Sequence, residues 1–537
     1  MSRRPAFAGE RAALAGVALM LVLLVGYPVI RLAGVALEQG WGAFAAALTG
    51  RGIPAAVWNT VWLGAAATVL ALVVGTAAAL VTERSTGGRR RWLRIGMLMP
   101  LLIPPFVAAL GWVEAYGPAG LSDDYLGFSL PRLFGAAGVV AVVVVNAVPL
   151  AYLVVAAGLA SRSEPDLERA ARAAGATAAQ AFRTVTLPLL RPSLVSGGGL
   201  VFVVAVNSFG IPVLLGTPAG FETMTTRIYR DLALSADPSS FAAVVAMATT
   251  LVAITFVAVA VSDAWSWLGG SVIRPGSPAG IPASGIRSRW PGLAVAGYVA
   301  ATSVIPFLAL VLRALTRALG LPPTPGNWTL DNFAEALRGS GGAFMNSLQL
   351  AGAAAVLAVI LGGAVAALGR GRRGWLGSLP VITFAVPGSA LAVAVLLAYG
   401  ARLRDSMLLI LVAYLAKFWA LGHRPIAGSM GNIAADLGRA ARVSGAGPLA
   451  RLRTVTIPLL WPAITAAMIM VFLFAFHELT MSALLYGPRS RTLAVVVLNM
   501  RQIGDVTVTA ALAVMLTLVV LAAGGLLGAA RRAGRAS

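Results

Sequence analysis

Side chains able to do chemistry are scarce in this chain. Of its 537 residues, 11% are charged, two are histidines and none is cysteine. His423 and His477 are too few for a zinc cluster, and a chain without cysteine forms neither disulfides nor thiolate sites. Lys417, the only lysine, lies in Leu415-Ala-Lys-Phe-Trp, which is not the G-x-x-x-x-G-K-[S/T] loop that binds nucleotide phosphates. We therefore expect no cofactor, no resident metal and no catalytic residue.

The elements that carry these few groups are strongly apolar. Hydrophobic residues make up 59% of the chain, and the charged fraction is less than half of the roughly 25% that is usual in water-soluble proteins. This composition excludes a large soluble catalytic domain and predicts an all-α integral membrane protein of about 12 transmembrane helices. The predicted spans are 12–32, 57–82, 95–116, 134–160, 193–216, 240–268, 290–315, 345–369, 378–400, 406–422, 462–486 and 506–529.

Arginines cluster in every second connection between these spans. A net charge of +22 could attract nucleic acid, but cationic clusters between apolar runs are typical of loops held on the cytoplasmic side. We therefore predict no nucleic-acid partner, contact with membrane lipid, and cytoplasmic N- and C-termini. Lys417, near the cytoplasmic end of the short span 406–422, is expected to reach the headgroups by snorkelling.

Two of the cationic loops carry an internal repeat. Asp166-Leu-Glu-Arg-Ala-Ala-Arg-Ala-Ala-Gly175 returns 270 residues later (166 to 436) as Asp436-Leu-Gly-Arg-Ala-Ala-Arg-Val-Ser-Gly445. Because each half holds an even number of predicted spans, both halves insert the same way up and form a parallel repeat. The predicted organisation is a first six-helix half, 1–270, with a patterned loop at 161–192, a cytoplasmic linker, 271–289, and a second six-helix half, 290–537, with its loop at 423–462.

Each patterned loop is predicted to fold as a helix, a glycine turn and a second helix. Ser163 opens the first helix as a capping residue, Gly175 ends it in a left-handed conformation, and Thr177 with Gln180 forms a second capping box. Asn432 has the capping role in the second half. Alanine and arginine on the exposed face favour a docking element for two identical soluble subunits, and the alternative is an amphipathic helix lying on lipid headgroups.

These loops resemble the cytoplasmic "EAA" loop of permeases in binding-protein-dependent ABC importers, which reads E-A-A, three residues, Gly, nine residues, I-x-L-P. The acidic position holds Arg169 and Arg439, with Glu168 one place earlier in the first half and Gly438 in the second. The resemblance implies two partner ABC ATPase subunits, a periplasmic or lipid-anchored solute-binding protein, a bacterial inner membrane location and no enzymatic activity in this chain. The implied ATPase-coupling residues are Glu168, Arg169, Ala170, Ala171, Gly175 and Pro188, and Arg439, Ala440, Ala441, Gly445 and Pro458.

Two six-span units fused in one chain resemble the ferric-iron and thiamine permeases. The stretch His477-Glu-Leu-Thr-Met-Ser-Ala-Leu-Leu-Tyr486 is similar to a segment of the ferric-iron branch. The resemblance thus implies ferric iron as the solute, with thiamine or another small solute as the alternative. The residues alone leave a gradient-driven secondary transporter open as another class. That class has its long cytoplasmic loop after the sixth span, whereas the patterned loops here follow the fourth predicted span of each half.

His477 and Glu478 are unusual because two ionisable residues stand together inside the predicted span 462–486. They lie roughly 21 Å along that helix at 1.5 Å per residue, in its outer half. Ionisable groups at such depth are costly unless they face a cavity or a partner. We hypothesise that they line a translocation pathway, with Asn207 and Phe209 opposite. The alternative is a position near the outer headgroups or a bond between helices that serves packing.

Overall fold

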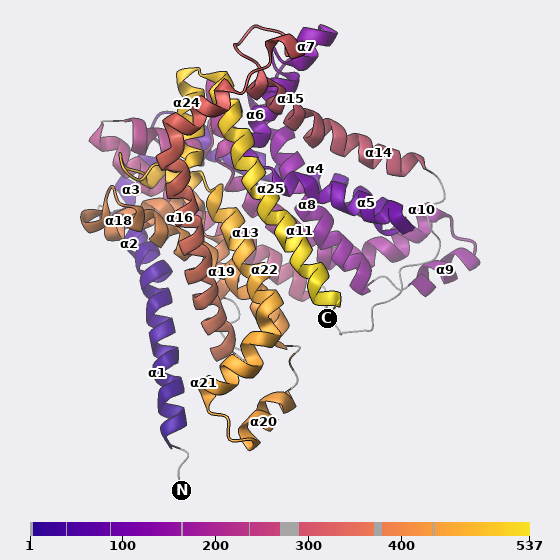
Figure 1. Ribbon diagram of the computed structural model, residues 1–537, viewed down its shortest axis with the longest axis vertical. Coiled ribbons are helices and arrows are strands. Elements are labelled where there is room, and N and C mark those ends of the chain that lie inside the picture. The colour runs from indigo at the N-terminus through magenta and orange to yellow at the C-terminus, as the bar shows by residue number, and fades with distance from the viewer. Residues whose placement is uncertain are drawn as a thin grey trace. The chain divides into compact units, whose positions relative to one another are not determined.

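Figure 1 shows a computed structural model that describes residues 4–38, 40–85, 87–162, 165–235, 237–268, 289–369, 379–431, 433 and 435–536. Ten helices within these ranges are long and apolar enough to cross a membrane, and the number reaches 12 if two sharply bent helix pairs each count as one span. The described residues hold no strand, only one isolated bridge between Thr316 and Trp328. The all-α membrane fold is therefore confirmed. The caps predicted at Ser163 and Asn432, and the linker 271–289 apart from its last residue, lie outside the described residues.

The chain divides into two compact units. Unit 2 comprises residues 49–228 and 253–332. Its centre is α4, which packs against α8 and α11, while α15 packs against α6. The helices of this unit are α4 (Ile53–Glu83), α5 (Gly87–Leu98), α6 (Pro105–Tyr116), α7 (Leu121–Leu126), α8 (Ala136–Arg162), α9 (Pro165–Ala173), α10 (Ala178–Ala181), α11 (Leu187–Val206), α12 (Met224–Tyr229), α14 (Trp290–Val299) and α15 (Ile305–Leu315).

Unit 1 comprises residues 1–48, 229–252 and 333–537. Within it α19 packs against α22, and α2 packs against α18. The helices that lie wholly or mainly in this unit are α1 (Arg4–Leu21), α2 (Tyr27–Leu37), α3 (Gly40–Leu48), α16 (Asp331–Leu368), α17 (Leu379–Ala385), α18 (Gly388–Leu403), α19 (Met407–Gly431), α20 (Ala435–Val443), α21 (Pro448–Arg451), α22 (Ile457–Phe476), α23 (Thr480–Leu485), α24 (Leu493–Ile503) and α25 (Val506–Ala536); α13 (Pro238–Leu268) has residues in both units.

The two compact units do not coincide with the two predicted sequence halves. Residues 1–48, which open the first half, belong to the unit built mainly from the second half, and residues 290–332, which open the second half, belong to the unit built from the first. The first helical arm of each half is thus exchanged. The boundaries 1–270 and 290–537 remain a prediction about the repeat, and the compact units cut across them.

In the exchanged arm of unit 1, residues 1–48, a proline follows a wide helical turn. The π-helical turn η1 (Val22–Gly26) leads into α2, where the N–H of Tyr27 bonds the carbonyl of Val22, five residues earlier. In that register the next bond would run from Pro28 to the carbonyl of Leu23, but proline has no N–H to donate. The hydroxyl of Tyr399, in α18, donates to this carbonyl at 2.5 Å. A tyrosine therefore satisfies the acceptor that the proline leaves open.

The same device recurs in unit 2. The π-helical turn η7 (Ala300–Val304) precedes Pro306, whose missing N–H leaves the carbonyl of Ala301 open. Tyr116, in α6, donates its hydroxyl to Ala301 at 2.5 Å, and the indole of Trp112 donates to the next carbonyl, Thr302, at 3.0 Å. Each exchanged arm is thus tied to a third-span helix of the opposite sequence half.

The third span of each half is broken. The segment Gly87–Leu102 meets Pro105–Leu126 at 100°, and α17 meets α18 at 95°. Pro104 and Pro387 stand at the breaks in extended conformation, with ψ of 139° in both. The predicted spans 95–116 and 378–400 are therefore each two short helices. A break leaves backbone N–H and C=O groups without their helical partners, and lipid cannot form hydrogen bonds with them. Each break therefore needs protein donors and acceptors around it.

Candidate coupling loops and intramembrane polar groups

The first patterned loop has the predicted local structure. α9 ends at a Schellman turn, in which the N–H of Ala176 bonds the carbonyl of Ala171 at 3.0 Å and Gly175 has a φ of +89°. Thr177 and Gln180 form both bonds of a capping box at the start of α10. A π-helical turn, η3 (Phe182–Thr186), then leads into α11, so the loop and the predicted fifth span form one continuous path.

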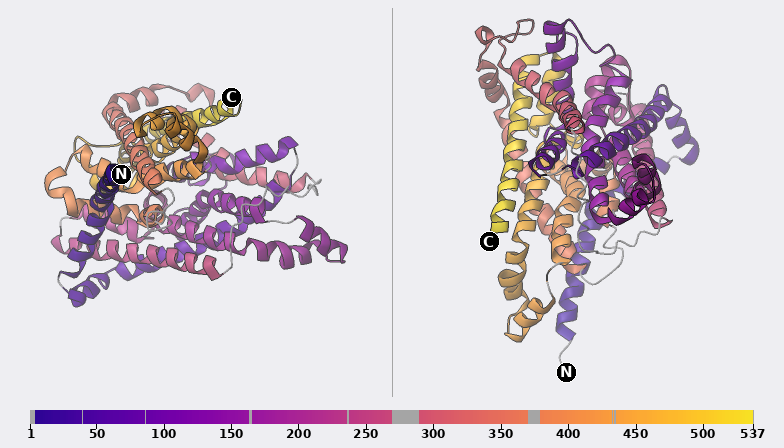
Figure 2. Two further views of the ribbon diagram at one scale, coloured as in Figure 1. Left: turned by 90° about the horizontal axis from the view of Figure 1, so that it is seen from below. Right: turned by 90° about the vertical axis from the view of Figure 1, so that its right-hand side faces the viewer.

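The second patterned loop repeats this backbone. The N–H of Ala446 bonds the carbonyl of Ala441 at 2.9 Å, and Gly445 has a φ of +78°. α21 and the π-helical turn η10 (Leu452–Thr456) then lead into α22. The hairpin of α20 and α21 lies beyond the N-terminal end of α22 (Figures 1 and 2). The helix, glycine turn and helix predicted from the repeat are therefore present in both loops.

The predicted docking face is open in each loop. Arg169, Ala170 and Gly175 are exposed, as are their repeats Arg439, Ala440 and Gly445, while Ala171 and Ala441 are partly buried. Leu167 and Leu437, also at repeated positions, are 44% and 46% exposed. Small, apolar and cationic side chains therefore occupy the same surface of both loops, as a protein partner would require. The docking role of these residues remains a prediction.

Three of the predicted coupling residues, Pro188, Pro458 and Glu168, have structural roles. Pro188 and Pro458 lie in the first turn of α11 and α22, where the missing N–H follows the wide π-helical turn. Glu168 points away from the open face. Its carboxylate bonds Arg84 at 2.9 Å and Arg172 at 2.9 Å, and its side chain is 15% exposed. Gly438 holds no side chain that could repeat these bonds.

The predicted pathway residues lie after their spans, not inside them. α11 ends at Val206 and α22 at Phe476, so the spans predicted at 193–216 and 462–486 are too long at this end. Asn207 and His477 are the C-terminal caps of the two helices. The Oδ1 atom of Asn207 is buried and has no hydrogen-bond partner among the described residues. Phe209 is buried at 2% exposure.

Glu478 bonds backbone of its own segment. Its carboxylate accepts hydrogen bonds from the N–H groups of Met481 and Ser482, at 2.9 and 3.1 Å, and so caps the start of α23. The hydroxyl of Tyr414, in α19, lies 2.6 Å from that of Ser482. Glu478 therefore helps to hold the turn after α22 against α19, which agrees with the packing alternative. The pathway hypothesis itself remains untested.

Lys417 does not reach towards headgroups, and the snorkelling prediction is wrong. Its ammonium group donates to the carbonyls of Phe384, at 3.1 Å, and Val386, which lie at the break between α17 and α18. It also lies over the ring of Phe384, 5.4 Å from the centroid, and its charge interacts with that of Glu478. The open carbonyls of a broken helix attract the cation more strongly than the distant interface does, because lipid offers them no donor.

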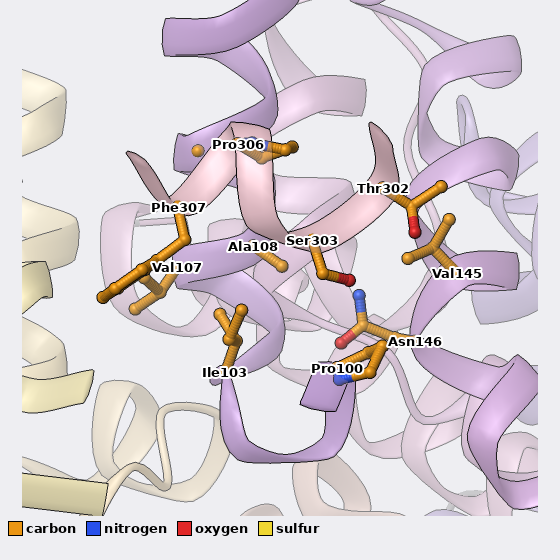
Figure 3. Close-up of a pocket in the computed structure, with 11 residues that line it drawn as sticks. Pro100, Ile103, Val107, Ala108, Val145, Asn146, Thr302, Ser303, Pro306 and Phe307 are labelled. Carbon is orange, nitrogen blue, oxygen red and sulfur yellow. The ribbon is translucent and has the colours of Figure 1, made fainter. Parts of the chain in front are cut away.

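The break in unit 2 lies beside a small pocket. The pocket is lined by Pro100 and Ile103, which precede the break, and by parts of α6, α8 and the exchanged arm. Asn146, from α8, points its amide into this space towards Ser303 and Pro100 (Figure 3). The amide group of Asn146 donates a hydrogen bond to the carbonyl of Val142 in its own helix, at 3.0 Å. Thr302 also lines the pocket, and the other walls are mostly apolar, including Ile103, Val107, Val145, Pro306 and Phe307.

Two buried ion-pair groups were missed by sequence reasoning. Glu83, at the end of α4, bonds Arg90 at 2.6 Å, and its side chain is 3% exposed. Glu114 bonds Arg313 at 2.8 Å, with 7% and 6% of the side chains exposed, and so ties α6 to the arm helix α15. Single acidic residues inside or at the end of otherwise apolar runs are the pattern that could have indicated both groups.

Comparison with known proteins identifies the family. Residues 71–266 and 354–533 both match the family described as "Binding-protein-dependent transport system inner membrane component". The chain belongs to this family. It is therefore a multi-pass permease subunit of a binding-protein-dependent ABC importer, with the family domain present twice. The resemblance predicted from the two loops and the fused two-half architecture are thus confirmed.

Two of the relatives of this permease match most of its length, and a third matches less than half of it. A probable ABC transporter permease of Sinorhizobium fredii is 27% identical over 474 residues, which cover 84% of this chain and 82% of the relative. A ferric transport system permease of Actinobacillus pleuropneumoniae is 25% identical over 487 residues, 86% of this chain and 69% of the relative. A molybdenum transport system permease of Mycobacterium tuberculosis is 35% identical over 210 residues, 38% of this chain and 76% of the relative.

Proposed function

We propose that this permease moves ferric iron across the bacterial inner membrane, with energy from two separate ABC ATPase subunits. A solute-binding protein in the periplasm, or anchored to lipid, delivers the ion at the outer face. The main support is the similarity to a ferric transport system permease along 86% of this chain, together with the His477–Tyr486 stretch that resembles the ferric-iron branch. The chain itself does not hydrolyse ATP in this proposal, and both of its termini are cytoplasmic.

The two patterned loops are the proposed ATPase docking sites. Support comes from their repeated backbone, with Schellman turns at Gly175 and Gly445, and from the exposed Ala170 and Ala440 at the same register. Small exposed side chains allow the backbone of a partner to approach closely. ATP-driven closure of the two ATPases draws α9 and α20 towards each other and turns the spans from inward-open to outward-open. The cargo then passes the turn that follows the fifth span of each half, where Asn207, His477 and Glu478 lie.

Thiamine and molybdenum oxyanions are the competing solutes. A thiamine transport system permease of Brucella abortus is 32% identical over 42% of this chain, and the molybdenum relative has the higher identity of 35% over 38% of the chain. Both alignments cover only about one half, whereas the ferric relative extends through both halves. This coverage favours iron.

A reconstitution experiment tests the proposal. The permease is expressed with its neighbouring ATPase and binding protein, purified, and placed in liposomes with radioactive ferric iron, thiamine or molybdate outside and ATP inside. We expect one permease for two ATPases and ATP-dependent uptake of iron alone. Uptake of another solute would replace the substrate. Uptake by the permease alone, driven by a proton or sodium gradient, would overturn the importer mechanism.

Substitutions in the glycine turns test the docking site. Gly175→Val and Gly445→Val place a β-branched residue at a φ of +89° or +78°, a conformation that only glycine adopts readily. No heavy atom lies within 4 Å of the added Cβ in either case, so the Cβ itself causes no clash and the positive φ is the main source of strain. We expect each variant to lose most of the co-purified ATPase while the permease remains in the membrane. Full retention of the ATPase and normal transport would contradict the docking assignment.

A further inference from the structure

The first coupling helix is attached to the body of its unit by one carboxylate. Glu168, in α9, bonds Arg84, the C-terminal cap of α4, at 2.9 Å, although the two residues lie 84 positions apart in the chain. The same carboxylate bonds Arg172, one helical turn further along α9, at 2.9 Å. The side chains of Arg84 and Glu168 are 22% and 15% exposed, so this ion pair is shielded more than the rest of an exposed loop. Shielding strengthens such a pair relative to one on an open surface.

Glu83, the residue before Arg84, links the ends of three helices: α4, α5 and α8. Glu83 is 3% exposed and accepts hydrogen bonds from Arg90 at 2.6 Å and Arg94 at 2.8 Å, both in α5. The hydroxyl of Tyr152, in α8, bonds the same carboxylate at 3.1 Å. A buried carboxylate with two guanidinium partners and a phenol is held in one geometry because any departure leaves a charge without compensation. The ends of α4, α5 and α8 are therefore fixed to each other, and Arg84 connects α9 to them.

The second coupling helix lacks the groups that make this connection. The position of Glu168 holds Gly438, and that of Tyr152, also 270 residues on, holds Gly422. In α20, Asp436 bonds Arg439 of the same helix, and both side chains are largely exposed, at 79% and 66%. That pair joins two residues of one helix and links α20 to nothing else. The two coupling loops thus share a backbone but differ in their charged groups.

We propose that Glu168 is a positioning residue of the transport cycle. It acts as a strut that transmits movement of the first coupling helix directly to α4, α5 and α8, so that the two coupling helices have unequal mechanical roles. The proposal depends on the proposed docking of ATPases on α9 and α20, and it adds that the acidic side chain of the first loop serves an internal contact instead of a contact with the ATPase.

The first experiment requires no partner. Hydrogen–deuterium exchange is measured on the purified full-length permease and on the Glu168→Ala and Arg84→Met variants. Both variants should raise the exchange rate of residues 165–175 by about fivefold or more and leave residues 435–445 unchanged. The matched control, Asp436→Ala in α20, should alter neither segment by a comparable factor. Unchanged exchange at 165–175 in both Glu168→Ala and Arg84→Met would overturn the strut.

The second experiment measures coupling in the reconstituted importer. Glu168→Ala should bind two ATPases as the native chain does, yet transport several-fold fewer solute molecules per ATP hydrolysed. Glu168→Asp should restore part of that ratio, and Asp436→Ala should leave it unchanged. A normal ratio in Glu168→Ala would overturn the proposal. If the native complex fails to transport at all, the proposed function is wrong, but the exchange result still decides whether the strut exists.

Discussion

The third span breaks at a proline in both sequence halves, yet the polar side chains beside the two breaks differ. In the second half, the ammonium group of Lys417 bonds the carbonyls of Phe384 and Val386 at the break. The residue 270 positions earlier is Ala147, whose side chain can donate no hydrogen bond. Its neighbour Asn146 instead lines a pocket beside the break in unit 2 (Figure 3).

The turn that follows the fifth span also carries a charged residue in the second half and a neutral one at the repeated position in the first half. Glu478 caps α23 and interacts electrostatically with Lys417. The residue at the repeated position is Ser208, which is neutral. Thus a cation and an anion influence each other electrostatically in unit 1, and the repeated positions in unit 2 carry no charge. The duplicated backbone breaks twice, but only the break in unit 1 receives a hydrogen bond from the side chain at the repeated position, Lys417. Chemical asymmetry between the halves has therefore developed on a symmetric framework.

The largest effect is expected from removing the cation. Lys417→Met leaves two carbonyls at the break without their donor and Glu478 without its cation. We expect the free energy of unfolding to fall by about 3 kcal/mol, the lower end of the cost of removing one partner of a buried charge pair. The matched variant in unit 2, Asn146→Ala, should cost less, because its bond goes to its own helix. Denaturant unfolding of the purified variants in detergent measures both values.

A double variant shows whether the two charges act as a pair. Lys417→Met with Glu478→Gln removes both charges, and its loss should be smaller than the sum of the single losses by about 0.5–3 kcal/mol. Strict additivity would mean that Lys417 serves the carbonyls alone. Equal losses for Lys417→Met and Asn146→Ala would erase the proposed asymmetry between the breaks.

Close helix contacts give a second test, with intermediate effects. A Cβ at Gly362, in α16, would lie 2.4 Å from the backbone nitrogen of His423 in α19, and one at Gly75, in α4, would lie 2.8 Å from the Cβ of Ala151 in α8. Helices in membranes approach this closely only where residues are small. Gly362→Ala and Gly75→Ala should each destabilise the permease by about 1–3 kcal/mol. The larger loss is expected at Gly362, because the added Cβ meets backbone atoms of α19 more closely there than it meets α8 at Gly75.

Gly352, which lies in α16 like Gly362, supplies the control for this comparison. Gly352 has no heavy atom within 4 Å of a built Cβ, so Gly352→Ala should be neutral or slightly stabilising because alanine favours helix. Thermal unfolding in detergent ranks the three variants. A destabilised Gly352→Ala, or a larger loss at Gly75 than at Gly362, would contradict the contacts described here.

The sequence allowed the helix, glycine turn and helix of both patterned loops to be predicted. Gly175, Gly445 and the Thr177–Gln180 capping box act through local backbone rules, and the repeat places the two glycines in register. Lys417 was misassigned because its partners are carbonyls of residues more than 30 positions away, which no local pattern reveals. The link from Glu168 to Arg84 was missed for the same reason. The exchanged arms were also missed, since hydropathy predicts where spans occur and not which neighbours they choose.

The smallest predicted effect concerns the tyrosines that hold the exchanged arms. Tyr399→Phe removes the donor to the Leu23 carbonyl, and Tyr116→Phe removes the donor to the Ala301 carbonyl. Each change should cost about 1 kcal/mol, in the range measured for hydrogen bonds between membrane helices. Tyr116→Phe should cost less, because Trp112 still holds the neighbouring carbonyl of the same arm, whereas the position that matches Trp112 in the second half holds Val395.

Thermal unfolding of Tyr399→Phe, Tyr116→Phe and the double variant Tyr116→Phe with Trp112→Phe measures this difference. The double variant should lose at least as much stability as Tyr399→Phe, since both side-chain donors to its arm are gone. If Tyr116→Phe alone already matched Tyr399→Phe, the tryptophan would contribute nothing to the junction. The asymmetry between the halves would then be confined to the charged residues, and the exchanged arms would be held equally firmly in the two units.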